Sequence, residues 1–190
     1  MDGNNFTFNG IGEYLLLQSI GNDFDIQARY VQFNSTTNAT VTSTVAIRQG
    51  QSQIVQIGST DKKLQLYVNG TPYELPNTES VIVVSETHVF TDFESFSNDS
   101  AAFVSGYISI RNDSGTLILS ASSEASVMVS IQTSFIRIVI ELPESFMNDT
   151  RGLLGYFNGN PEDDFRLPND TTLPHNLTEE EVYRFGLQCK

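Results

Sequence analysis

Short segments in which apolar and polar residues alternate, often with β-branched side chains, recur along most of the chain. Because successive side chains of a strand point to opposite faces, this alternation predicts strands with one buried face. Turn-forming residues separate the segments, as in the Asn-Gly pair at 69–70 and Asn-Asp-Ser-Gly at 112–115, which predict two hairpins. The predicted strands cover residues 14–18, 24–33, 41–48, 54–57, 64–68, 81–85, 103–111, 116–121, 127–132 and 135–142. Their spacing predicts an all-β fold, mainly an antiparallel β-sandwich.

One short helix is predicted near the C-terminal end. Thr178 and Glu181 have the spacing of a capping box, in which each side chain accepts a hydrogen bond from the other residue's backbone. Acidic residues fill the first turn, where the helix dipole favours them, and Gly186 is expected to end the helix. The predicted fold class is therefore all-β with one short C-terminal helix.

Length and charge limit the classes of function. The 190 residues suit a single domain spanning 1–190. With 23 acidic and 10 basic residues, the net charge of −13 repels nucleic acid and anionic lipid, so we expect no nucleic-acid partner. The sequence has no apolar run of 18 residues, and we expect no direct membrane insertion by this segment.

Asn-X-Ser/Thr sequons are unusually frequent. Fifteen Asn among 37 Ser and Thr residues would give roughly three sequons by chance, and the chain has nine. We therefore expect N-glycosylation in the secretory pathway and an extracellular or cell-surface location, with the acceptors in exposed turns or strand ends. The acceptors are Asn5, Asn34, Asn38, Asn69, Asn98, Asn112, Asn148, Asn169 and Asn176.

Cys189 is the sole cysteine, so no disulfide can form within the chain. We expect Cys189 to form a disulfide with a cysteine outside this chain; an intermolecular bridge is the alternative. The polar N-terminal residues do not form a signal peptide, and we expect the chain to be a domain excised from a larger extracellular protein.

The segment Gly-Leu-Leu-Gly-Tyr-Phe-Asn-Gly-Asn-Pro-Glu-Asp-Asp-Phe-Arg at 152–166, called the acidic loop below, combines glycine turns with oxygen-bearing side chains. Asn158, Asn160, Asp163 and Asp164 offer the hard oxygen ligands that Ca²⁺ prefers. The spacing is not that of an EF-hand, because the bidentate Glu and flanking helices are missing. The loop is therefore a candidate cation site, and the alternative is that these residues form only Asx-turns.

The sequence GLLGYFNGNPEDDFRLPN at 152–169 resembles the von Willebrand factor type D domain, in the cysteine-poor form of mucin-4-like membrane mucins. The Asp-Gly at 2–3 with FTFNGIGEY at 6–14, and EEEVYRFGL at 179–187, are similar to the start and the end of that domain. The resemblance implies a Ca²⁺ cofactor. It further implies the ligand set Asp2, Asn158, Asn160, Asp163 and Asp164, in which Asn160 can contribute its backbone carbonyl.

The resemblance implies a non-catalytic extracellular domain of a mucin-like, membrane-anchored glycoprotein, with a structural and protein-interaction (adhesion) role. Its partners would be other extracellular proteins or domains, including neighbouring domains of the same parent. One alternative is a Ca²⁺-dependent ligand or glycan recognition module. A second is a hydrolase that uses Asp163 and Asp164, which is disfavoured because sequence neighbours rarely flank a glycosidic bond from both sides.

An aromatic group gathers around 90–103 and consists of Phe90, Phe93, Phe96 and Phe103. It would form either a recognition patch or part of the core. Since the chain has no Trp and needs large side chains to fill a sandwich, we predict core packing.

Overall fold

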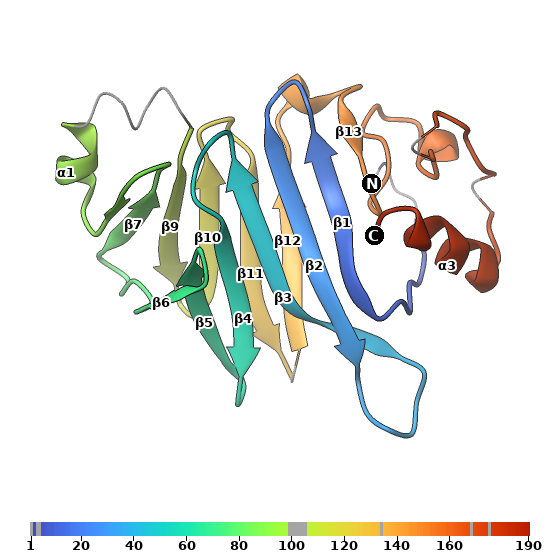
Figure 1. The fold of residues 1–190 in the computed structure, drawn as a ribbon, viewed down its shortest axis with the longest axis horizontal. Helices are drawn as coiled ribbons and strands as arrows, with labels where there is room; N and C mark the ends of the chain where they lie inside the picture. Colours follow the sequence, from blue (N-terminus) through green and yellow to red (C-terminus); the bar gives the residue numbers. More distant parts are fainter. Residues whose placement is uncertain (1, 3–4, 99–105, 134, 168, 175) are drawn as a thin grey trace. The chain divides into compact units, whose positions relative to one another are not determined.

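The computed structural model describes residues 2, 5–98, 106–133, 135–167, 169–174 and 176–190. Two antiparallel sheets and a short C-terminal helix confirm the predicted fold class (Figure 1). The chain divides into two compact units, residues 1–43 with 144–190, and residues 44–143. The single-domain interpretation of 1–190 stays a prediction, and the two units are described separately.

The first unit is built on strand β1, Gly12–Ser19, which pairs on one side with β2, Phe24–Gln32, and on the other with β13, Thr150–Arg151. A bulge between Leu15 and Leu17 interrupts the β1–β2 register. Past β13, the edge of β1 continues to bind backbone, because Leu153 N donates to Leu15 O at 2.9 Å. β1 thus has partners along both edges.

Strand β3, Thr40–Gln49, begins in the first unit and continues into the second. The first unit also contains the 3-10 helices η1, Glu144–Phe146, and η2, Pro161–Asp163, and the helix α3, Glu179–Leu187. The predicted capping box of Thr178 and Glu181 is present in α3. Phe24 of β2 packs edge-to-face on Phe146 of η1 with ring centroids 5.7 Å apart, and both rings are fully buried.

Gly186 does not end α3, so that expectation was wrong. The helix continues to Leu187 with Gln188 as its C-cap, and Gly186 is buried inside it. A Cβ at position 186 would overlap the Phe8 ring. Glycine is used here so that an aromatic side chain can lie directly on the helix backbone.

The second unit contains two sheets that pack face to face, since β4 contacts β12 and β5 contacts β11. In one sheet β3 is followed by β4, β5 and β6, and the strand order of the other is β12-β11-β10-β9-β7-β8 (Figure 1). Buried positions alternate along the strands, as the period of two requires. The strand bounds are Val55–Thr60 (β4), Lys63–Val68 (β5), Thr71–Tyr73 (β6), Val81–Val84 (β7), Val89–Phe90 (β8), Ile108–Asp113 (β9), Thr116–Ala121 (β10), Ser126–Gln132 (β11) and Phe135–Glu141 (β12).

Both predicted hairpins are present. Asn69 and Gly70 have φ of +47° and +78°, and Ser114 and Gly115 have φ of +52° and +88°. Two successive positive φ angles are the mark of a type I′ turn, which matches the twist of the strands that it joins. Residues 103–105 of the predicted strand 103–111 lie outside the described residues, and β9 begins at Ile108.

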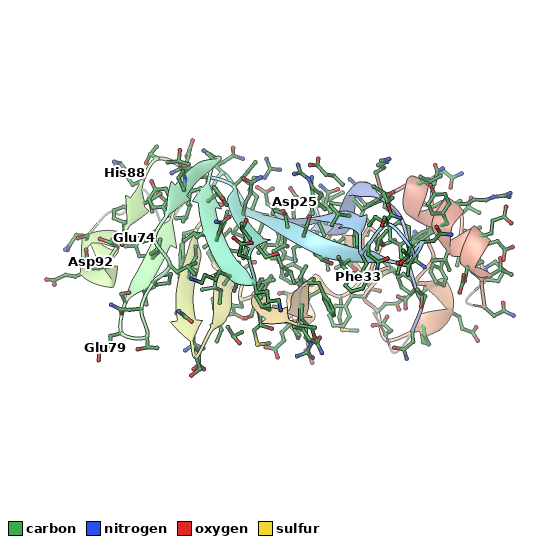
Figure 2. All side chains as sticks on the ribbon, turned by 90° about the horizontal axis from the view of Figure 1, so that it is seen from below. Asp25, Phe33, Glu74, Glu79, His88 and Asp92 are labelled. Atoms are coloured by element: carbon green, nitrogen blue, oxygen red, sulfur yellow. The ribbon has the colours of Figure 1, made fainter. Side chains whose placement is uncertain are left out.

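The elements that were not predicted are all short. β6, β8 and β13 have three, two and two residues, and β6 contains Pro72, which is tolerated because β6 is an edge strand. The five-residue helix α1, Phe93–Ser97, follows the N-cap Asp92, which is labelled in Figure 2. Among the described residues, none of the helices is long and apolar enough to span a membrane.

The aromatic group around α1 contributes to a core. Phe96 is fully buried, its ring centroid is 4.7 Å from that of Tyr107 and 5.6 Å from that of Phe90, and it packs on buried Val83. The side chains of Phe93 and Phe103 lie outside the described part of the chain. For Phe96, core packing is therefore the correct interpretation.

Replacing Phe96 tests this interpretation. Phe96→Ala is expected to lower the free energy of unfolding by about 3–5 kcal/mol, because it removes a buried ring and leaves a cavity. Urea denaturation measures the loss, and Phe96→Leu, which refills part of the space, is expected to lose less. A loss below about 1 kcal/mol for Phe96→Ala would instead indicate a surface residue.

Candidate functional site

The acidic loop leaves β13 through two glycines with positive φ. Gly152 has φ of +122°, and a Cβ there would lie 2.7 Å from the carbonyl oxygen of Leu16. Gly155 has φ of +93°, and its Cβ would lie 2.6 Å from Oδ1 of Asp164. Real Cβ atoms do not approach so closely, so these glycines let the loop lie against β1 and let Asp164 fold back on it.

The side chain of Thr150 binds the backbone of the acidic loop at two positions, Gly155 and Phe157. Its hydroxyl Oγ1 is buried, accepts a hydrogen bond from Phe157 N at 2.7 Å and donates to Gly155 O at 3.3 Å. One side chain therefore satisfies the part-buried amide of Phe157 and the buried carbonyl of Gly155, neither of which pairs with β1.

Asp2 reaches the loop from the other end of the sequence. Its Oδ2 accepts hydrogen bonds from the backbone N–H groups of Asn158 and Gly159, both at 2.9 Å. A carboxylate that accepts two amides makes charge-assisted bonds, which are stronger than neutral ones. The structure thus places Asp2 beside the loop residues that the family resemblance grouped with it.

The two asparagines of the proposed ligand set form turns. Asn158 Oδ1 accepts from Asn160 N at 2.8 Å, and Asn158 Nδ2 donates to Asp163 Oδ2 at 2.9 Å. Asn160 Oδ1 accepts from Glu162 N at 3.2 Å and caps η2. Both side-chain oxygens already bind backbone, as the Asx-turn alternative expects.

The two aspartates of the loop differ from the asparagines, because each has a buried oxygen. Asp163 Oδ1 is inaccessible to solvent and has no hydrogen-bond partner among the described residues. Asp164 is only 2% exposed. Burial raises the pKa of Asp164. The positive charge of the chain's amino terminus opposes this shift, the Asp2 carboxylate adds a smaller increase, and the backbone N–H of Tyr156 favours the charged form.

These carboxylates do not form a closed metal-binding cluster. Within the described ranges, no group of three or more His, Cys, Asp or Glu side chains is arranged to hold a metal ion. The geometry of the loop therefore combines plain Asx-turns with buried acidic oxygens, and ion binding stays a prediction.

Phe165 fixes the end of the loop in the core. Its ring is 2% exposed and lies edge-to-face between Phe6 and Phe185 of α3, with centroid distances of 5.3 and 5.2 Å. The N-terminal segment, the acidic loop and the C-terminal helix are thus packed on one aromatic side chain.

Cys189 lies inside this unit. It is 8% exposed, its Sγ donates to Phe185 O at 3.8 Å, and burial raises the pKa of the thiol to about 11. A thiol with a raised pKa reacts slowly, since the thiolate is the nucleophile. The predicted disulfide to a cysteine outside the chain stays a prediction.

Cys189 also lines a cavity of about 470 Å³ that the sequence did not indicate. Arg151 and Arg166 lie in its wall, and Arg166 stands over the Tyr156 ring, 4.7 Å from the centroid. Arg166 also pairs with Asp170 at 3.2 Å. The lining comes from β1, β13, the acidic loop and the C-terminal end, so only the folded backbone brings it together.

All nine sequon asparagines are among the described residues. Eight have exposed side chains, as predicted for acceptors, whereas Asn112 is half-buried. Its Nδ2 donates to Pro76 O at 3.1 Å and its Oδ1 accepts from Gly115 N at 3.0 Å. Asn112 therefore has a structural role in its turn that a glycan on Nδ2 would disturb.

The sequence matches the von Willebrand factor type D domain over residues 1–171. The chain belongs to this family. The match includes Asp2 and the whole acidic loop, so the type D assignment covers both ends of the contact described above.

Several curated proteins are similar to this type D chain. Human Sushi domain-containing protein 2 is 34% identical over 191 residues and human mucin-4 is 32% identical over 192, with 97% and 98% of this chain covered. Protein mesh of Bombyx mori is 26% identical over 185 residues, with 87% covered. The chain spans 21%, 3% and 10% of these relatives' lengths, respectively.

Thr150 offers a test of how the acidic loop is held. Thr150→Val is expected to lower the free energy of unfolding by about 2 kcal/mol, because it removes the hydroxyl that binds the part-buried Phe157 N and the buried Gly155 O. Thr150→Ser keeps the hydroxyl and is expected to lose much less. Urea denaturation of protein made without glycosylation measures both, since the Val variant also removes the Asn148 sequon. Equal losses in the two variants would contradict the hydroxyl's role.

Proposed function

We propose that this type D domain is a non-catalytic structural and protein-interaction module of an extracellular, mucin-like glycoprotein, stabilised by Ca²⁺ in the acidic loop. The module would contact other extracellular proteins or neighbouring domains of its parent. Support for the setting comes from nine sequons and from similarity to proteins named mucin-4 and Sushi domain-containing protein 2. Support for the ion comes from the loop itself.

The observation that carries the ion proposal is the buried Oδ1 of Asp163, which has no hydrogen-bond partner in the part of the chain that the structure describes. A buried carboxylate oxygen without a donor is unfavourable unless a cation compensates it. Asp164 is buried nearby in sequence, and the Asp2 carboxylate acts on it electrostatically. A divalent cation bound near Asp2 and Asp164 would remove the repulsion between their carboxylates and so stabilise the fold.

The proposed ligand residues carry the kinds of oxygen atom that Ca²⁺ binds. Asp2, Asp163 and Asp164 would supply carboxylate oxygens, and Asn158 and Asn160 would supply amide or backbone carbonyl oxygens. Asn160 would use its backbone carbonyl, because its Oδ1 already caps η2. A bound Ca²⁺ would neutralise the acidic oxygens and hold residue 2 and residues 158–164 together.

Unfolding with and without the ion tests the proposal. Ca²⁺ at 100 times its Kd is expected to add about 2.7 kcal/mol to the free energy of unfolding relative to chelator. Asp163→Ala/Asp164→Ala is expected to abolish this difference. The matched control Glu74→Ala/Glu79→Ala removes two exposed acidic residues, labelled in Figure 2, and should keep it. No effect of Ca²⁺ on the wild type would overturn the ion proposal.

Asp164→Asn provides a pH-dependent test, in which the order of stability of variant and wild type is expected to reverse when Ca²⁺ is added. Since the pKa of Asp164 is raised by folding, its charged form lowers stability, and this loss grows as pH rises from the unfolded pKa to the folded one. In chelator at pH 7 the variant is therefore expected to be more stable than the wild type, with the difference vanishing below about pH 4. In saturating Ca²⁺ the order is expected to reverse. Urea denaturation at pH 3–8 measures both series, and a variant that is less stable at pH 7 in chelator would contradict the argument.

A further inference from the structure

The acidic loop contains Asn158-Gly159, one of three Asn-Gly pairs in the chain, with Asn9-Gly10 and Asn69-Gly70. In an Asn-Gly pair the backbone nitrogen of the glycine can attack the asparagine side-chain carbon, because glycine has no Cβ to obstruct the approach. We propose that Asn158 is a latent deamidation site and that the Asp2 carboxylate holds it unreactive by binding the backbone N–H of Gly159.

The chemistry needs only water and a base. The Gly159 nitrogen loses its proton to solvent base and bonds to Cγ of Asn158, the bond from Cγ to the side-chain nitrogen breaks, and ammonia leaves. Water then opens the cyclic imide at either carbonyl. The products are an aspartate at position 158, or an isoaspartate whose main chain runs through the former side chain.

The structure blocks the first step at the nucleophile. The Gly159 N–H donates to Asp2 Oδ2 at 2.9 Å, and the same oxygen accepts from the amide of Asn158 at 2.9 Å. A proton held between the nitrogen and a carboxylate is hard to remove, and the peptide plane cannot turn toward Cγ while both bonds persist. Asp2 therefore acts on the atom that would start the reaction.

The side chain under attack is held as well. Asn158 Oδ1 accepts from Asn160 N at 2.8 Å, and Asn158 Nδ2 donates to Asp163 Oδ2 at 2.9 Å. Gly159 itself is exposed, so solvent base and water reach the site once the tethers open. Of these contacts between described residues, the one with Asp2 comes from outside the loop, so displacement of Asp2 would remove it.

Conversion of Asn158 would change both the charge and the backbone of the acidic loop. An aspartate at position 158 would add a fourth carboxylate to the group of Asp2, Asp163 and Asp164, and an isoaspartate would lengthen the turn by one atom. The reaction is irreversible, so the fraction of converted Asn158 would increase with the total time that Asp2 is detached from the loop. The inference holds whether or not an ion binds there.

The test follows conversion at Asn158 during incubation at pH 8 and 37 °C in chelator, using protein produced without glycosylation. Trypsin releases residues 152–166 as one peptide. Its other asparagine, Asn160, precedes proline, which has no N–H to form the imide, so an amide-to-acid mass gain reports Asn158 alone. Fragment spectra and isoaspartate methyltransferase labelling identify the two products.

Asp2→Ala is expected to speed conversion at Asn158 roughly tenfold or more, the factor that follows from losing hydrogen bonds to a charged group. Asp2→Asn keeps an acceptor oxygen and is expected to retain part of the protection. Asn69-Gly70 is the internal reference, because the Asn69 side chain is also hydrogen-bonded, to Ile54 N at 3.0 Å and Gln53 Oε1 at 3.3 Å, whereas among the described residues no side chain binds the Gly70 amide. It is expected to convert faster than Asn158 in the wild type.

Two results would overturn the inference. One is an Asn158 that converts as fast as Asn69 in the wild type, or equally slowly in wild type and Asp2→Ala. The other is an Asp2→Ala variant in which Asn9 accelerates together with Asn158, because Asn9 lies in the same unit and would report its general loosening.

Discussion

The first unit depends on closing its N-terminal residues onto segments that follow them by more than 130 positions. Leu15 N donates to Cys189 O at 2.7 Å, Leu154 N donates to Leu16 O at 2.9 Å, and Asp2 binds the amide of Asn158. The first two bonds connect β1 to chain that has almost no regular structure of its own. Without them the part of the β1 edge that β13 does not cover would lose these backbone hydrogen bonds, which is costly in a packed interior.

This closure explains why acidic and apolar residues lie so close together in the loop. Phe165 must be buried between Phe6 and Phe185, and its sequence neighbour Asp164 is buried with it. Gly155 removes the side chain that would otherwise keep Asp164 away. The burial of charge is therefore a consequence of anchoring the loop, and it is what creates the need for a compensating cation in the proposed function.

Much of the fold could be predicted because its signals are local. Each strand longer than three residues was predicted, although for β9 the predicted start lies outside the described residues, and Asn69-Gly70 and Thr178 with Glu181 directly encode a turn and a cap. β13 and β6 were missed since two or three residues carry no periodicity. Gly186 was misread because its role depends on Phe8, which lies 178 positions away in sequence.

The candidate site was only partly predictable for the same reason. Composition indicates oxygen ligands, but it does not distinguish Asn158 and Asn160, whose side-chain oxygens bind backbone, from Asp163, whose Oδ1 has no donor. In the sequence Thr150 could be recognised only as part of the Asn148 sequon. Its structural role could not be predicted, because its hydroxyl forms its hydrogen bonds only after Gly155 and Phe157 have folded around it. Asx-turns and the proposed ion site use the same residues, and the observation that favours the proposed ion is the burial of one carboxylate oxygen. Burial is a property of the closed chain, so it becomes visible only when both ends of the unit are in place.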